Sequence, residues 1–130
     1  MNYIDNFNKF VQINENISRY DFGTYHDNIP EIWNNFFVES IPLKDNEKEI
    51  LFGILDDFGV DDFGRSLIFC VNMENLQLTC MYNILYLGDY CYAIFVEKIS
   101  ERESSMYRVE IIDGFDDLCQ SLEKIKQTVE

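Results

Sequence analysis

The first half of the chain alternates between helical hydrophobic spacing and short polar breaks. Residues 2–13 repeat apolar side chains every three to four positions, which is typical of an amphipathic helix. A second helix is predicted to begin at Pro30, because proline suits the first turn of a helix. A third helix is predicted over residues 46–58, with Asp45 as its N-terminal cap and Gly59 as its C-terminal cap.

The second and third predicted helices each have one apolar face, which we expect to pack against the core. In the second helix this face consists of Ile29, Trp33, Phe36 and Phe37. In the third helix it consists of Ile50, Leu51, Ile54, Leu55 and Phe58. Trp33 is the only tryptophan. We interpret it as a core residue, with an interface anchor as the alternative.

The hydrophobic period changes after residue 65, where continuous and alternating apolar runs replace the helical spacing. These runs predict strands at residues 66–72, 76–82, 83–87, 90–99 and 106–112. The run at 90–99 is predicted to be the longest strand and follows a turn signal at Gly88 and Asp89. A last helix is predicted after Asp113 and Gly114, with an apolar stripe formed by Phe115, Leu118, Cys119, Leu122 and Ile125.

The order of these elements predicts an α+β fold. Strands that follow one another without intervening helices favour an antiparallel sheet. We therefore expect N-terminal helices, an antiparallel sheet of four to five strands and a C-terminal helix. The length of 130 residues suits a single domain spanning residues 1–130.

The charge of the chain limits the partners that it can bind. The sequence holds 24 acidic and 10 basic residues, for a formal net charge of −14. This charge repels nucleic-acid phosphates and attracts basic proteins, so direct nucleic-acid binding is not expected. The first residues lack the apolar run of a signal peptide, and no apolar stretch reaches the ~18 residues of a membrane span. We expect a cytoplasmic protein with no membrane partner.

The residues that usually carry catalysis or bind metals are sparse. Cys70, Cys80, Cys91 and Cys119 form no C-x-x-C pair and mostly lie in apolar runs, which predicts reduced and mostly inaccessible thiols. His26 is the only histidine and is far from every cysteine in the sequence, which argues against a zinc site or a catalytic triad. We therefore predict no enzyme activity, no cofactor and no metal.

The run LDDFGVDDFGR repeats the tetrapeptide Asp-Asp-Phe-Gly. The predicted helix end places Asp56 and Asp57 against the negative end of the helix dipole, at a cost of about 0.3–1 kcal/mol each. Asp61 and Asp62 add repulsion, and Arg65 is the only cation within the run. The run lacks the alternating oxygens of a calcium loop. A solvated helix end, a weak divalent-cation site and a recognition surface remain as interpretations.

Two parts of the chain resemble the SUKH superfamily. Residues 28–37, NIPEIWNNFF, are similar to the Leu-Pro-Glu-aromatic helix near the start of SUKH domains. Residues 88–98 and 107–125 are similar to the family's closing strands and final helix. Residues 38–40 replace the glycine pair that usually follows the first helix. The resemblance implies an α+β domain of a type commonly used as a bacterial immunity protein against secreted toxins, many of them nucleases.

These observations favour an immunity or inhibitor protein. We expect it to bind a basic protein, most often a toxin with nuclease activity, and to cover the active site with an acidic surface. The alternatives are a nucleic-acid-mimicking phage inhibitor of a host defence nuclease and a small non-catalytic ligand-binding regulator. The predicted partner-binding residues are Asp56, Asp57, Asp61, Asp62, Phe63, Glu101, Glu103, Asp116 and Asp117.

Overall fold

The computed structural model describes residues 23–29 and 31–128, so the helix predicted at residues 2–13 lies outside the described residues. In chain order the elements are α2 (Glu31–Glu39), α3 (Asp45–Ile54), η2 (Asp56–Phe58), β1 (Asp61–Asp62), β2 (Ser66–Met73), η3 (Glu74–Leu76), β3 (Leu78–Gly88), β4 (Cys91–Ser100), β5 (Met106–Asp113) and α4 (Phe115–Gln127). No helix in this part of the chain is both long and apolar enough to cross a membrane.

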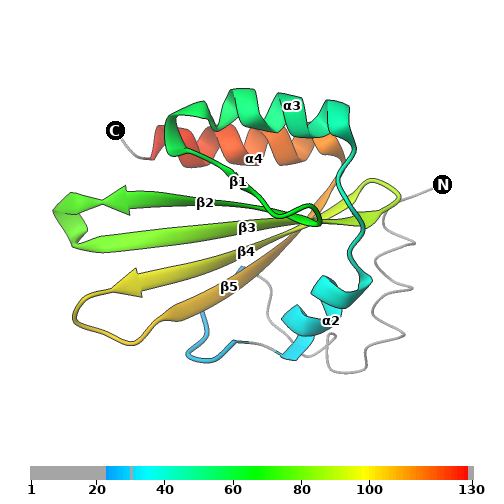
Figure 1. Ribbon diagram of the computed structural model, residues 1–130. Coiled ribbons are helices and arrows are strands. Elements are labelled where there is room, and N and C mark those ends of the chain that lie inside the picture. Colours follow the sequence, from blue (N-terminus) through cyan, green and yellow to red (C-terminus); the bar gives the residue numbers. More distant parts are fainter. Residues whose placement is uncertain (1–22, 30, 129–130) are drawn as a thin grey trace.

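The five strands form one sheet in the order β1-β2-β3-β4-β5, and every neighbouring pair is antiparallel (Figure 1). This arrangement and the C-terminal helix α4 confirm the predicted α+β class. A short segment before α2 extends the sheet beyond β5, because His26 and Tyr107 exchange two backbone hydrogen bonds of 2.8 Å.

The sheet has helices on both faces (Figure 1). Helices α3 and α4 pack on one face through a core that includes Leu51, Leu118 and Leu122. Helix α2 packs on the other face, where Phe36 is fully buried and Trp33 stacks on Phe95 with ring centroids 4.3 Å apart. Trp33, which was interpreted as a core residue, is only partly buried and packs against the edge of this core.

The antiparallel order gives the sheet two distinct ends. The β1–β2 turn, the β3–β4 turn and the start of α4 lie at one end, which we name the Tyr90 end and which is on the right in Figure 1. The β2–β3 turn, the β4–β5 loop and the last turn of α4 lie at the other end, which we name the Leu76 end. Side chains far apart in the sequence are thereby brought to a common end.

Several predicted boundaries are wrong. Asp45 is the first residue of α3 and not its cap; Lys44 holds the cap position and no side chain bonds there. The α-helix ends at Ile54, and a tighter 3₁₀ turn follows until Gly59 adopts a left-handed conformation with φ of 67°. The predicted C-terminal role of Gly59 therefore holds for the 3₁₀ turn.

The strand predictions also needed correction. Residues 76–82 and 83–87 belong to one strand of 11 residues, so β3 and not β4 is the longest strand. Its ladder continues through Asn83, which pairs with Ile68 and Phe95. The two-residue strand β1 was not predicted, because two adjacent aspartates carry no strand signal.

Three predicted core-facing residues are exposed, namely Ile29, Phe37 and Ile50. Ile29 precedes α2, whereas Phe37 and Ile50 each lie in a helix beside a fully buried neighbour, Phe36 and Leu51. A helix that packs on one sheet face buries only its central stripe, so the margins of an apolar face stay in solvent.

Candidate partner-binding surface

The predicted partner-binding residues separate into two groups at opposite ends of the sheet. At the Tyr90 end lie residues of β1, the β1–β2 turn and the start of α4, namely Asp61, Asp62, Phe63, Asp116 and Asp117. The others lie toward the Leu76 end: Asp56 and Asp57 follow α3, and Glu101 and Glu103 lie in the β4–β5 loop. The nine residues therefore do not form one continuous surface.

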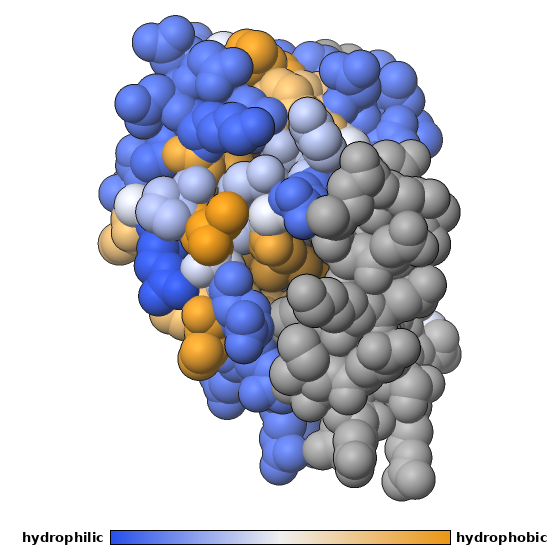
Figure 2. All heavy atoms as spheres, turned by 90° about the vertical axis from the view of Figure 1, so that its right-hand side faces the viewer, coloured by the Kyte–Doolittle hydropathy of each residue, from blue (hydrophilic) through white to orange (hydrophobic). Residues whose placement is uncertain are grey.

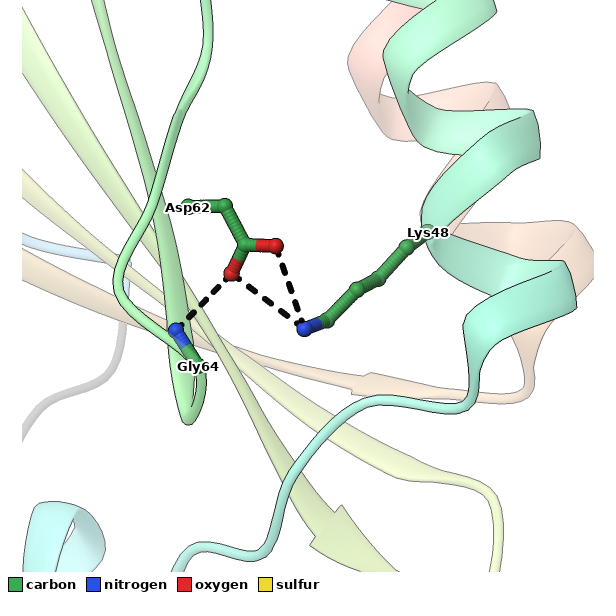
Figure 3. Close-up of polar contacts among 3 residues, drawn as sticks. All are labelled: Lys48, Asp62 and Gly64. Atoms are coloured by element: carbon green, nitrogen blue, oxygen red, sulfur yellow. Dashed lines mark hydrogen bonds and ion pairs between the residues drawn. The ribbon is translucent and has the colours of Figure 1, made fainter.

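Asp62 has a structural role in the β1–β2 turn (Figure 3). Its Oδ1 accepts a hydrogen bond of 2.8 Å from the backbone N–H of Gly64 and lies 3.2 Å from Nζ of Lys48. The Gly64 hydrogen bond is the main cause that lowers the pKa of Asp62, and Lys48 lowers it further. Since Lys48 lies on α3, this carboxylate fastens the turn to the helix above it.

Arg65 does not neutralise the acidic run. Its Nη2 donates hydrogen bonds to the carbonyl oxygens of Val38 at 3.0 Å and Ser40 at 2.6 Å, and its guanidinium lies 5.7 Å from the ring centroid of Phe37. The guanidinium therefore satisfies carbonyls at the end of α2. The cation that pairs with the acidic run is Lys48, which contacts Asp62, and not Arg65, the cation within the run.

The Tyr90 end also presents apolar side chains to solvent. Phe63 is 64% exposed at the tip of the β1–β2 turn, and Tyr90 is 54% exposed in the β3–β4 turn. The segment at the end of α2 adds three more exposed residues, namely Phe37, Val38 and Ile41. Arg65 contacts this segment at Phe37 and Val38, and Ile41 pairs with Tyr86 of β3. Figure 2 shows this end of the molecule, where hydrophobic residues form separate patches between hydrophilic ones.

The β3–β4 turn joins the apolar residues to the acids of α4. The backbone N–H of Gly114 donates a hydrogen bond of 2.6 Å to the carbonyl oxygen of Tyr90, so α4 begins directly beside the turn. Asp116 and Asp117 are exposed in the first turn of α4, where the helix dipole favours acids by about 0.3–1 kcal/mol each. These two acids therefore stabilise α4 in addition to any role in binding.

Asp113 adds an acid that is less well accommodated. Its Oδ1 is buried and makes no hydrogen bond within the described part of the chain. Burial is the main cause that raises the pKa of this carboxyl, and the charge of Asp117 raises it further. The start of α4 is thus a strongly acidic place, and sequence reasoning missed Asp113 because it was interpreted only as a turn residue.

The thiols are free but not equally accessible. Cys80 and Cys91 are buried and Cys119 is half-buried, whereas Cys70 is exposed on β2, so Cys70 is an exception to the predicted, mostly inaccessible thiols. The strand alternation explains the difference, because Cys70 lies between the core residues Phe69 and Val71 and faces the other side of the sheet.

Residues 23–29 and 31–128 contain no group of three or more His, Cys, Asp or Glu side chains placed to hold a metal ion.

Comparison with known proteins gave no relative. No protein-family model, no curated protein and no solved structure matches the chain. The geometry of the two ends of the sheet is therefore the basis for any functional argument.

Proposed function

We propose that the protein is a non-catalytic immunity or inhibitor protein of the cytoplasm. It binds a basic protein, a toxin with nuclease activity, and covers the active site of that toxin with an acidic surface. We place the contact at the Tyr90 end. The observation that supports this choice is the coincidence of exposed acids and exposed aromatic side chains there, on two hairpin turns and the start of one helix.

Each part of this surface has a physical role in binding. Phe63 and Tyr90 offer large apolar areas, and aromatic residues are enriched at the centres of protein interfaces. Asp61, Asp116 and Asp117 are exposed and add negative charge at the same end of the sheet. Such charges attract a basic partner over long distances and accelerate its association.

The remaining predicted acids have a lesser role in this proposal. Asp56, Asp57, Glu101 and Glu103 lie toward the other end of the sheet and add only to the long-range field of the net charge of −14. Asp62 is occupied by Lys48 and Gly64 and supports the shape of the turn. The resemblance to SUKH domains agrees with this proposal but rests on short motifs.

Two variants with the same change in charge test the location of the contact. The Tyr90-end variant carries Asp61→Asn, Asp116→Asn and Asp117→Asn. The Leu76-end variant carries Asp57→Asn, Glu101→Gln and Glu103→Gln. Both raise the net charge by three, so any difference between them comes from position and not from total charge.

The wild type and both variants are immobilised and used to capture proteins from an extract of the native host. We expect one basic protein to be retained by the wild type and the Leu76-end variant and lost from the Tyr90-end variant. The purified partner should cleave nucleic acid, and addition of the wild type should stop the cleavage. Equal retention by the two variants, or a partner whose activity is unaffected, would contradict the proposal.

A further inference from the structure

A hollow lies at the Leu76 end, on the sheet face that carries α4. It has a volume of about 530 Å³ and opens between the last turns of α4 and the ends of β3, β4 and β5. The helix has 13 residues and spans about 20 Å, whereas β3 has 11 residues and spans about 36 Å. A helix this much shorter than the strands leaves part of the sheet face uncovered. The volume is within the range of about 300–1,000 Å³ that is typical of small-molecule sites.

The lining of this pocket is basic although the protein is acidic. The whole chain has ten basic residues, and three of them line this one pocket: Lys98 from β4, Arg108 from β5 and Lys124 from α4. Among the described residues that line the pocket, Glu110 is the one acid. Three elements that are separate in the sequence therefore converge to give an excess of positive charge in a concave site.

Arg108 is held in a way that leaves one donor unused. Its Nη1 lies 2.6 Å from Oε1 of Glu110, which fixes the guanidinium. Its Nε is buried and has no hydrogen-bond partner within the described residues. A buried donor without a partner destabilises the fold, so an acceptor that enters the pocket and reaches this group would relieve the cost.

Tyr25 gathers two cations beside its ring. Nζ of Lys98 lies 5.3 Å and Cζ of Arg108 lies 5.1 Å from the ring centroid. The hydroxyls of Tyr25 and Tyr82 are protonated at neutral pH and can donate hydrogen bonds, and burial raises the pKa of both still further. The two lysines and the guanidinium have like charges, and an anion among them would lower their mutual repulsion.

Part of the pocket wall is apolar. Met73, Leu78 and Ile125 line the pocket, together with the ring of Tyr82. A simple inorganic ion would leave these walls in contact with water. The complementary ligand therefore has an anionic group for the cations and an aromatic or aliphatic body for the walls.

We propose that this pocket binds a small organic anion, in which a phosphate or carboxylate group is attached to an apolar body. The site is independent of the proposed partner surface, because the two lie at opposite ends of the sheet.

The test uses the full chain and two probe pairs that separate charge from shape. Adenosine monophosphate is compared with adenosine, and 1-naphthoate is compared with 1-naphthalenemethanol, with binding followed by protein-observed NMR titration. At least one anion should bind at least about tenfold more tightly than its neutral counterpart. Binding of neither anion below about 10 mM, or equal binding of anion and neutral compound, would overturn the proposal.

Matched variants place the bound anion in the pocket. Lys124→Gln removes a lining cation, and Lys126→Gln removes a cation from the same helix turn that does not line the pocket. We expect Lys124→Gln to weaken the anion about tenfold or more and Lys126→Gln to change its affinity less than about twofold. Equal losses in the two variants would show nonspecific charge attraction and refute the site. Lys98→Gln serves as a second lining variant if Lys124→Gln lowers the melting temperature.

Discussion

Tyr92→Phe is the most informative stability variant, because it removes one atom from a buried polar pair. The hydroxyl of Tyr92 donates a hydrogen bond of 2.7 Å to Oε1 of Glu47, and both residues are buried. Glu47 lies in the first turn of α3 and Tyr92 near the start of β4, so this bond connects a helix to a central strand. Without the hydroxyl, the carboxylate of Glu47 stays buried and loses this donor.

The expected loss follows from the type of bond. A hydrogen bond to a charged group contributes about 1.5–3 kcal/mol, so Tyr92→Phe should lower the free energy of unfolding by this amount. Tyr86→Phe is the control, since Tyr86 stacks on Tyr92 at 4.9 Å, is also buried, and its hydroxyl has no hydrogen-bond partner among the described residues. The control removes the same atom without breaking such a bond.

Urea denaturation followed by circular dichroism measures both variants, and a double-mutant cycle with Glu47→Gln isolates the pair. The coupling energy between Tyr92 and Glu47 should fall within the range of about 0.5–3 kcal/mol that is typical of residues in contact. Equal stability of Tyr92→Phe and Tyr86→Phe, or a coupling near zero, would show that this buried pair does not stabilise the fold.

Three further predictions concern single side chains. Asp62→Ala should lower the melting temperature while Asp61→Ala leaves it nearly unchanged, because only Asp62 bonds to Gly64 and pairs with Lys48; equal effects in thermal unfolding would contradict this. A thiol reagent should label Cys70 quickly in the native state and Cys91 only on unfolding, and mass spectrometry of early time points would show any reversal of this order. Burial raises the pKa of Cys91 from 9.0 to about 12, so between about pH 9 and 12 the unfolded state releases a proton that the native state retains, and stability falls as the pH rises. Cys91→Ala should make this fall shallower in denaturation curves measured across that range, and an unchanged slope would argue against the shifted thiol.

The elements with strong periodicity were predictable from the sequence. The stripe of Leu118 and Leu122 predicts α4, and the turn at Gly88 and Asp89 predicts the β3–β4 hairpin. Consecutive strands then imply an antiparallel sheet. That order places the acids of α4 and of the β1–β2 turn at the same end of the sheet. This part of the candidate surface follows from topology alone.

The other features of the fold and of the two candidate sites depend on long-range contacts that no local sequence pattern encodes. Arg65 bonds to carbonyl oxygens 25 and 27 positions away, and Glu47 bonds to a hydroxyl 45 positions away. Tyr90 looked like a strand residue, but its positive φ of 65° places it in a tight turn where its ring is exposed. The basic pocket joins three elements and could not be recognised in a chain whose overall charge is −14.

The central claim is that the Tyr90 end receives a basic partner, and the association rate of the purified complex tests it most directly. Stopped-flow measurements compare the wild type with the Tyr90-end and Leu76-end variants at low and high salt. We expect the wild-type rate to fall about tenfold or more as the Debye length shrinks from about 10 Å at 0.1 M to about 3 Å at 1 M. The Tyr90-end variant should associate several-fold more slowly at low salt, and the Leu76-end variant should stay close to the wild type. A rate that is insensitive to salt, or equal slowing by the two variants, would contradict the account.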